Sequence, residues 1–95
     1  MKADIEVIFH FNDNRKLFEG YRPTHLIDDK NLTTGVHHYY KKEDVKTEVK
    51  GTIEFIDPEY YPHCLWIGKK IDMYEGKTKI GYIEILRIFN SILEK

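Results

Sequence analysis

The alternation of apolar and polar side chains near the N-terminus is the feature that most constrains the fold. From Ile5 to Phe11 every odd position is apolar, and polar residues such as Glu6 and His10 stand between them. A period of two indicates a strand with one buried face. The aromatic content of 14%, which includes seven tyrosines, favours further strands over a helical bundle. The chain is therefore predicted to be all-β.

Five more strands are expected, each bounded by turn residues: Tyr21–Ile27, Leu32–Tyr40, Gly51–Ile56, Leu65–Tyr74 and Ile80–Phe89. The last of them also fits helical spacing, but its β-branched residues and the turn before it favour a strand. Six strands joined by short turns predict one domain, residues 1–95, folded as a small closed barrel.

The segments between the strands carry three further expectations. Gly35 is expected to mark a bulge. The charge-dense segment 41–50 is predicted to be a loop, and two prolines should make 57–62 a rigid corner. Glu75 and Gly76 are predicted to form a tight turn before the last strand.

Charge and cysteine content exclude several classes of function. With a net charge of −1 and a pI near 6.5, the protein has no overall positive potential that would attract nucleic acid or an anionic membrane. RNA binding would therefore need a local basic patch. The single cysteine cannot form an intrachain disulfide, and no secretory signal or apolar segment of about 20 residues is present. We expect a cytoplasmic protein without membrane contact.

The stretch Phe18–Pro23 concentrates residues that constrain or free the backbone more than any other part of the chain. Gly20 permits backbone angles that other residues avoid, and Pro23 fixes its own φ and favours an extended Arg22. The pattern predicts a bend that starts a strand. Tyr21 and Arg22 then either serve the barrel alone or contact a partner.

Four segments in the same order resemble the third, C-terminal domain of bacterial elongation factor Tu: Ala3–Val7, Gly20–Pro23, Thr33–Gly35 and Glu75–Gly81. The resemblance spans nearly the whole chain and implies a six-stranded antiparallel barrel. It does not imply the factor's activity, because the GTPase domain and the middle barrel have no counterpart in these residues. The chain is similar to a free-standing copy of one module.

In that family the domain contacts the T-stem backbone of aminoacyl-tRNA and packs against protein partners. The positions that match the tRNA contacts are Thr33 or Thr34, Glu75 and Gly76, and Arg15 and Lys16 resemble the family's basic pair. Asp57 stands where the family often carries a lysine, which exchanges attraction to phosphate for repulsion. The resemblance therefore implies a protein partner more than RNA.

Aromatic residues that could face solvent in part suggest two kinds of binding; the alternative is that one tyrosine of each adjacent pair lies in the core and the other packs across strands. Tyr61 and Trp66 are residue types that concentrate binding energy at protein interfaces. The same aromatics could stack on bases, because Lys69 and Lys70 lie close in sequence.

The five histidines and Cys64 raise the possibility of a metal site or an enzyme. His37 and His38 are adjacent, so they should point to opposite faces of a strand, and a metal site would have to be assembled across strands. The other interpretation is that the histidines are at the surface or half-buried. No third group orients a pair of Cys64 with His63 or His25, so we expect no catalysis.

The function expected from these observations is a non-catalytic binding module that engages a protein partner or a second copy of itself. RNA binding linked to translation is one alternative, and a small metal-dependent or Cys/His enzyme is another. We expect neither cofactor nor nucleotide, since Gly76 and Lys77 lack the upstream glycine of a phosphate-binding loop.

Overall fold

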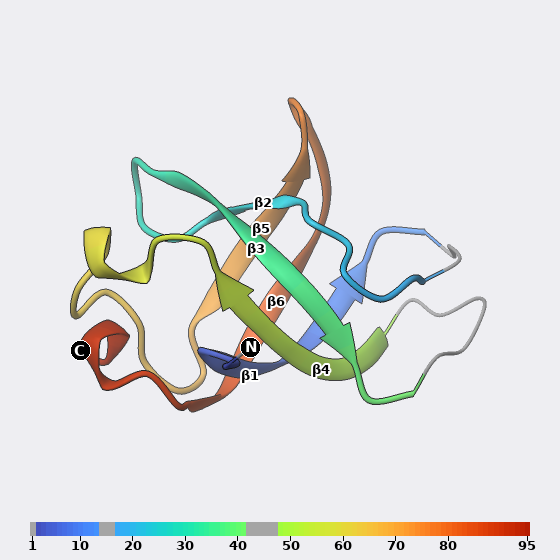
Figure 1. Ribbon diagram of the computed structural model, residues 1–95. Coiled ribbons are helices and arrows are strands. Elements are labelled where there is room, and N and C mark those ends of the chain that lie inside the picture. The colour runs from blue at the N-terminus through green and yellow to red at the C-terminus, as the bar shows by residue number, and fades with distance from the viewer. Residues whose placement is uncertain (1, 14–16, 42–47) are drawn as a thin grey trace.

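Six antiparallel strands close into a barrel in a computed structural model that describes residues 2–13, 17–41 and 48–95 (Figure 1). Around the barrel the strands follow the order β1-β4-β3-β2-β5-β6. The strands are β1 (Ile5–Phe11), β2 (Thr24–Leu26), β3 (Leu32–Tyr39), β4 (Glu48–Phe55), β5 (Lys70–Glu75) and β6 (Thr78–Ile88). The prediction of an all-β closed barrel with six strands is confirmed.

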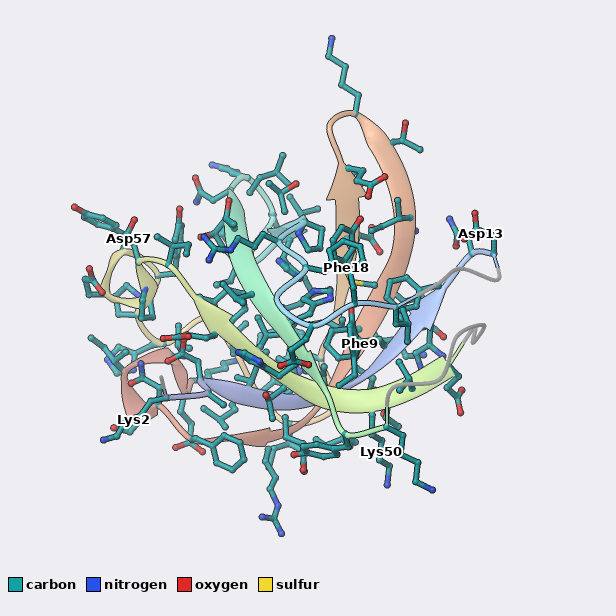
Figure 2. All side chains as sticks on the ribbon, turned by 45° about the vertical axis from the view of Figure 1, so that its right-hand side comes forward. Lys2, Phe9, Asp13, Phe18, Lys50 and Asp57 are labelled. Atoms are coloured by element: carbon teal, nitrogen blue, oxygen red, sulfur yellow. The ribbon has the colours of Figure 1, made fainter. Side chains whose placement is uncertain are left out.

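Alternating side chains explain why the strands face the interior as they do. In β1 the odd positions are buried and the even positions are partly exposed, as a half-buried strand requires. The interior is filled by aliphatic side chains and the ring of Phe9, as Figure 2 shows around the labelled Phe9. The largest fully buried apolar side chains are those of Ile5, Phe9, Ile27, Ile53, Leu65, Ile71, Met73, Ile83, Ile85 and Leu93.

The motif around Gly20 forms an extended segment beside β3 and is not part of β2. Gly20 has a φ of +83° and its N–H donates to the His37 carbonyl at 3.0 Å. The His37 N–H donates to the Tyr21 carbonyl at 2.8 Å, and the Gly35 N–H to the Pro23 carbonyl at 3.3 Å. The predicted bend is present, but β2 begins at Thr24 rather than Tyr21 because β5 pairs only with Thr24 and His25.

The expected bulge at Gly35 is wrong. Gly35 pairs with Phe55 in a continuous register between β3 and β4. Shifts of register fall instead between Glu6 and Val7, where β1 pairs with β6, and between Met73 and Tyr74 in β5. The reason for a glycine at position 35 is the close approach of a side chain, described below.

Three boundaries differ from expectation. β4 begins at Glu48 rather than Gly51, so residues 48–50 of the predicted loop belong to a strand. Residues 42–47 of that loop lie outside the described structure. β5 begins at Lys70 because residues 66–69 form a turn in which Gly68 has a φ of +91° and the Lys69 N–H donates to the Trp66 carbonyl. The corner 57–62 contains a 3-10 turn, η1 (Pro58–Tyr60), and a second, η2 (Ser91–Leu93), follows β6.

Candidate functional site

The described candidate residues divide into two groups near opposite ends of β5. Near the turn between β5 and β6 are Tyr21, Arg22, Thr33, Thr34, Glu75 and Gly76; near the start of β5 are Tyr61, Trp66, Lys69 and Lys70. Figure 1 shows the first region as a projecting hairpin and the second beside the C-terminus. Arg15 and Lys16 lie outside the described residues.

The hairpin end is held together by side chains of the predicted group. The Tyr21 hydroxyl donates to the Glu75 carboxylate, and the Tyr21 ring packs at right angles against His37 with 5.6 Å between centroids. Thr34 lies opposite Thr24 across the β2–β3 ladder. Tyr21 therefore contributes to the barrel itself, whereas Arg22 is exposed to solvent.

The second group belongs to a surface that we call the C-terminal corner, residues 58–69 and 91–95. Its two chain segments pair in parallel: the Leu65 N–H donates to the Leu93 carbonyl at 2.9 Å, and the Lys95 N–H to the Leu65 carbonyl at 2.7 Å. Leu65 and Leu93 are fully buried beneath it. Figure 1 shows η1 in yellow and η2 in red side by side in this corner. Its surface side chains therefore stand on a fixed support.

Four large apolar or aromatic side chains of the C-terminal corner remain exposed: Tyr60 (73%), Ile67 (66%), Trp66 (45%) and Ile92 (37%). Ammonium groups lie at the tryptophan ring, with Lys69 Nζ 4.5 Å and Lys95 Nζ 5.1 Å from its centroid. The corner therefore exposes several large apolar side chains, and Trp66 among them has cationic neighbours.

Lys69 has a structural role within this corner. Its Nζ donates to the carbonyl of Ile27 at 3.0 Å and to that of Cys64 at 2.8 Å. It thus ties the end of β2 to the corner, and these bonds compete with any contact to a phosphate. Lys70 lies 5.7 Å from the ring centroid of Tyr82, and Tyr61 is only partly exposed because it packs against the core.

Cys64 and His63 do not form an activated pair. The Cys64 thiol donates to the Tyr61 carbonyl at 3.1 Å, and burial raises the pKa of the thiol, with Lys69 opposing that change. His63 Nδ1 bonds the Glu94 carbonyl at 2.8 Å. A protonated thiol is a weak nucleophile, so the chemistry that could have supported an enzyme is not favoured at these residues.

Inside the barrel, two histidines from neighbouring strands are in direct contact. His25 of β2 and His37 of β3 are both completely buried, and their Nε2 atoms are 2.8 Å apart. His38 lies on the opposite, outer face, as predicted. The expectation that the histidines would be at the surface or half-buried is wrong for this pair, because β2 and β3 turn both rings into the core.

The hydrogen bonds of the pair fix its neutral tautomers. His25 Nδ1 is 3.4 Å from the Thr33 carbonyl, which can only accept, so this nitrogen carries the proton. His25 Nε2 is then an acceptor, and His37 Nε2 must donate to it. His37 Nδ1 in turn accepts from the Tyr39 hydroxyl at 2.8 Å. A single chain of donors therefore runs from Tyr39 through His37 and His25 to the backbone of β3.

Burial keeps both rings neutral. Loss of solvation lowers the pKa of His25 to about 4, although the Thr33 carbonyl opposes this. The pKa of His37 lies well below its ordinary value, first because of burial and then because of His25 and His38. A neutral pair is also the state that the donor chain requires.

The pair does not fit a metal ion. With Nε2 atoms in hydrogen-bond contact, no ion can occupy the space between them, since each Zn–N bond alone is about 2.0–2.1 Å long. Among residues 2–13, 17–41 and 48–95 no group of three or more His, Cys, Asp or Glu side chains could hold a metal.

The Gly35→Ala variant tests the packing of this pair. A Cβ at Gly35 would lie 2.6 Å from Ile53 Cγ2 and 2.9 Å from His25 Cε1, so the histidine ring needs a glycine beneath it. We expect a loss of about 1–3 kcal/mol in the free energy of unfolding, measured in urea, and a changed imidazole ¹⁵N spectrum of His25. Thr34→Ala is the control; an unaltered His25 spectrum in Gly35→Ala would contradict this role.

No protein-family model and no curated protein matches the chain. In the described part of the chain no helix is long and apolar enough to cross a membrane.

Proposed function

We propose that this protein is a non-catalytic binding module that docks a partner protein through the C-terminal corner. The observation that carries the proposal is the exposure of Trp66 and Ile67 on a corner fixed by backbone pairing. Contiguous exposed apolar side chains mark interaction sites, and tryptophan is enriched among the residues that dominate binding energy.

The rim around Trp66 indicates the kind of partner. Lys95 places an ammonium group at the Trp66 ring, so a partner surface with an apolar centre and a neighbouring carboxylate would complement it. Such rim charges favour association rate and orientation, while the ring itself supplies most of the buried area.

The resemblance to the third domain of elongation factor Tu supports the same kind of role. In that family the barrel serves as a docking module for other proteins. The closed six-stranded architecture and the placement of Glu75 and Gly76 in the β5–β6 hairpin are compatible with this kinship. A place in the cytoplasm, near the translation machinery, is part of the proposal.

Affinity capture with matched variants tests the docking surface. The immobilised wild type should enrich a specific protein from native lysate, and the corner variant Trp66→Ala/Ile67→Ser should reduce its yield at least tenfold, because the centre of the interface is removed. Phe18→Ser, which removes an even more exposed aromatic at the hairpin end, should leave the yield unchanged.

Other results would assign the function elsewhere. Capture that is lost in Arg22→Ala but kept in the corner variant would move the docking surface to the hairpin end. Sedimentation that shows a dimer dissolved by the corner variant would make the partner a second copy. Binding of tRNA that falls steeply with salt and is unaffected by the corner variant would replace the proposal with RNA binding.

A further inference from the structure

The contact between β2 and β5 is the seam with the shortest ladder among the described strands. It is registered at two positions, Thr24 with Tyr74 and His25 with Met73, whereas β1 and β6 pair along the whole of β1. Side chains add to it at both ends: the Thr24 hydroxyl donates to the Tyr74 carbonyl at 3.2 Å, and Lys69 Nζ donates to the Ile27 carbonyl at 3.0 Å.

His25 sits in the middle of this seam. Its backbone lies opposite Met73 of β5, and its ring points inward to His37 of β3. The same residue therefore joins the strand pairing of the seam to the buried imidazole pair.

We propose that the His25–His37 pair is an acid-sensitive latch, in which proton uptake releases β2 from β5 and opens the barrel along this seam. The donor chain explains the sensitivity. A proton on His25 Nε2 would face the proton already carried by His37 Nε2 at a separation of 2.8 Å between the nitrogens. Relief within the closed barrel would require His37 to change its tautomer, with His37 Nδ1 donating to the Tyr39 hydroxyl.

The groups packed around the two rings supply no negative charge to balance a protonated imidazole. Phe9 of β1 and Phe55 of β4 contact the rings, with centroids 4.3 Å from His37 and 5.8 Å from His25. Two further neighbours, Ile53 of β4 and Met73 of β5, are also apolar. The rings thus meet apolar surfaces on three strands.

Nearby titratable groups reach the pair indirectly. Tyr21 presents its ring to His37, while its hydroxyl is bonded to the Glu75 carboxylate. Glu19 accepts from the backbone N–H of Tyr39 at 3.3 Å and pairs with His38 on the outer face. The groups that act on the two imidazole pKa values, within the described structure, include no carboxylate. A charged ring therefore gains most by reaching water.

Release of β2 from β5 requires few ladder bonds to break. β2 has three residues, and it lies between the turn at Gly20 and a turn in which the Asp28 carboxylate accepts from the N–H groups of Lys30 and Asn31. β3 is also paired with β4, so movement of β2 breaks fewer ladder bonds than movement of β3. The opened state would expose both rings and the facing backbone edges of β2 and β5.

Amide hydrogen exchange at pH 7 and pH 5 tests the latch. In the closed barrel the pKa of His25 is about 4, against 6.5 for an exposed imidazole, so linkage predicts that protection factors at residues 24–26 and 73–74 fall at least about 20-fold at pH 5. Exposure of His37, whose pKa is also lowered, adds to this fall. Protection in β1 and β4 should remain. The double variant His25→Leu/His37→Leu should show no such fall, whereas His38→Gln should behave as the wild type.

The wild type supplies a second readout that does not depend on a variant. The ¹⁵N resonances of His25 and His37 should convert from neutral to protonated in the same pH range in which the seam amides lose protection. Seam protection that is equal at both pH values, or imidazoles that become protonated while the seam stays closed, would overturn the proposal.

Discussion

The Gly51→Ala variant should lose at least about 3 kcal/mol of its free energy of unfolding, measured by urea denaturation. Gly51 lies in β4 where it pairs with both β1 and β3. A Cβ there would lie 2.1 Å from the His38 carbonyl oxygen and 2.9 Å from Phe9 Cε2. The first of these atoms belongs to the backbone, so relief requires separation of the strands.

Gly76→Ala is the control for this prediction. Gly76 has a φ of +59°, and a Cβ at this position would meet nothing within 4 Å, so only the left-handed backbone conformation opposes the alanine. Its expected loss is about 1–2 kcal/mol. A Gly51→Ala protein that unfolds at the same urea concentration as Gly76→Ala would contradict the packing described here.

Acidification should remove on the order of 3 kcal/mol of stability through His25 alone. The folded protein holds the pKa of His25 at about 4, below its ordinary value of 6.5, so the unfolded chain binds more protons between these values. The stability contributed by the neutral ring is fully present above pH 6.5 and is lost as the pH falls toward 4. His37, whose pKa is also lowered, extends the loss to lower pH.

Urea denaturation in steps across this pH range measures the effect. The double variant His25→Leu/His37→Leu replaces both partners with apolar side chains, so its stability should depend much less on pH between 6.5 and 4. A single variant, His37→Leu, should be less stable than the double one because it leaves His25 Nε2 buried without its donor. Equal pH profiles in wild type and double variant would show that carboxylates, and not this pair, govern acid sensitivity.

Local sequence patterns predicted most of the barrel because alternation and turn residues act over short range. The bounds of β1 and the assignment of the last segment as a strand were correct on these grounds. Expectation was wrong where a contact outside the strand sets the boundary. Leu65 pairs with Glu94 in the C-terminal corner instead of continuing into β5, and a strand pattern holds no information on that pairing.

The His25–His37 pair illustrates the same limit for buried polar groups. Each histidine alone is compatible with the surface, and only the register of β2 against β3 brings the two rings together. One signal was available in hindsight: Thr33, Gly35, His37 and Tyr39 share one face of β3, and a glycine between larger residues on a buried face leaves space for a side chain from a neighbouring strand.

The exposure of Trp66 could be anticipated only as one of several options. A tryptophan in this sequence context could equally have packed into the core, and its position depends on the parallel pairing of 63–65 with 92–95. Lys69 shows the opposite case. Its position near an aromatic residue in the sequence was the basis of the RNA-binding alternative. In the structure its ammonium group is bonded to two backbone carbonyls.

Trp66 is the single tryptophan of the chain, so oxidative footprinting of this residue in the captured complex tests the proposed docking surface most directly. Mass spectrometry after hydroxyl-radical exposure would compare Trp66 with Phe18 in the free and bound protein. The docking proposal predicts that oxidation of Trp66 falls at least several-fold on binding while that of Phe18 is unchanged. Equal oxidation of Trp66 in both states would contradict it.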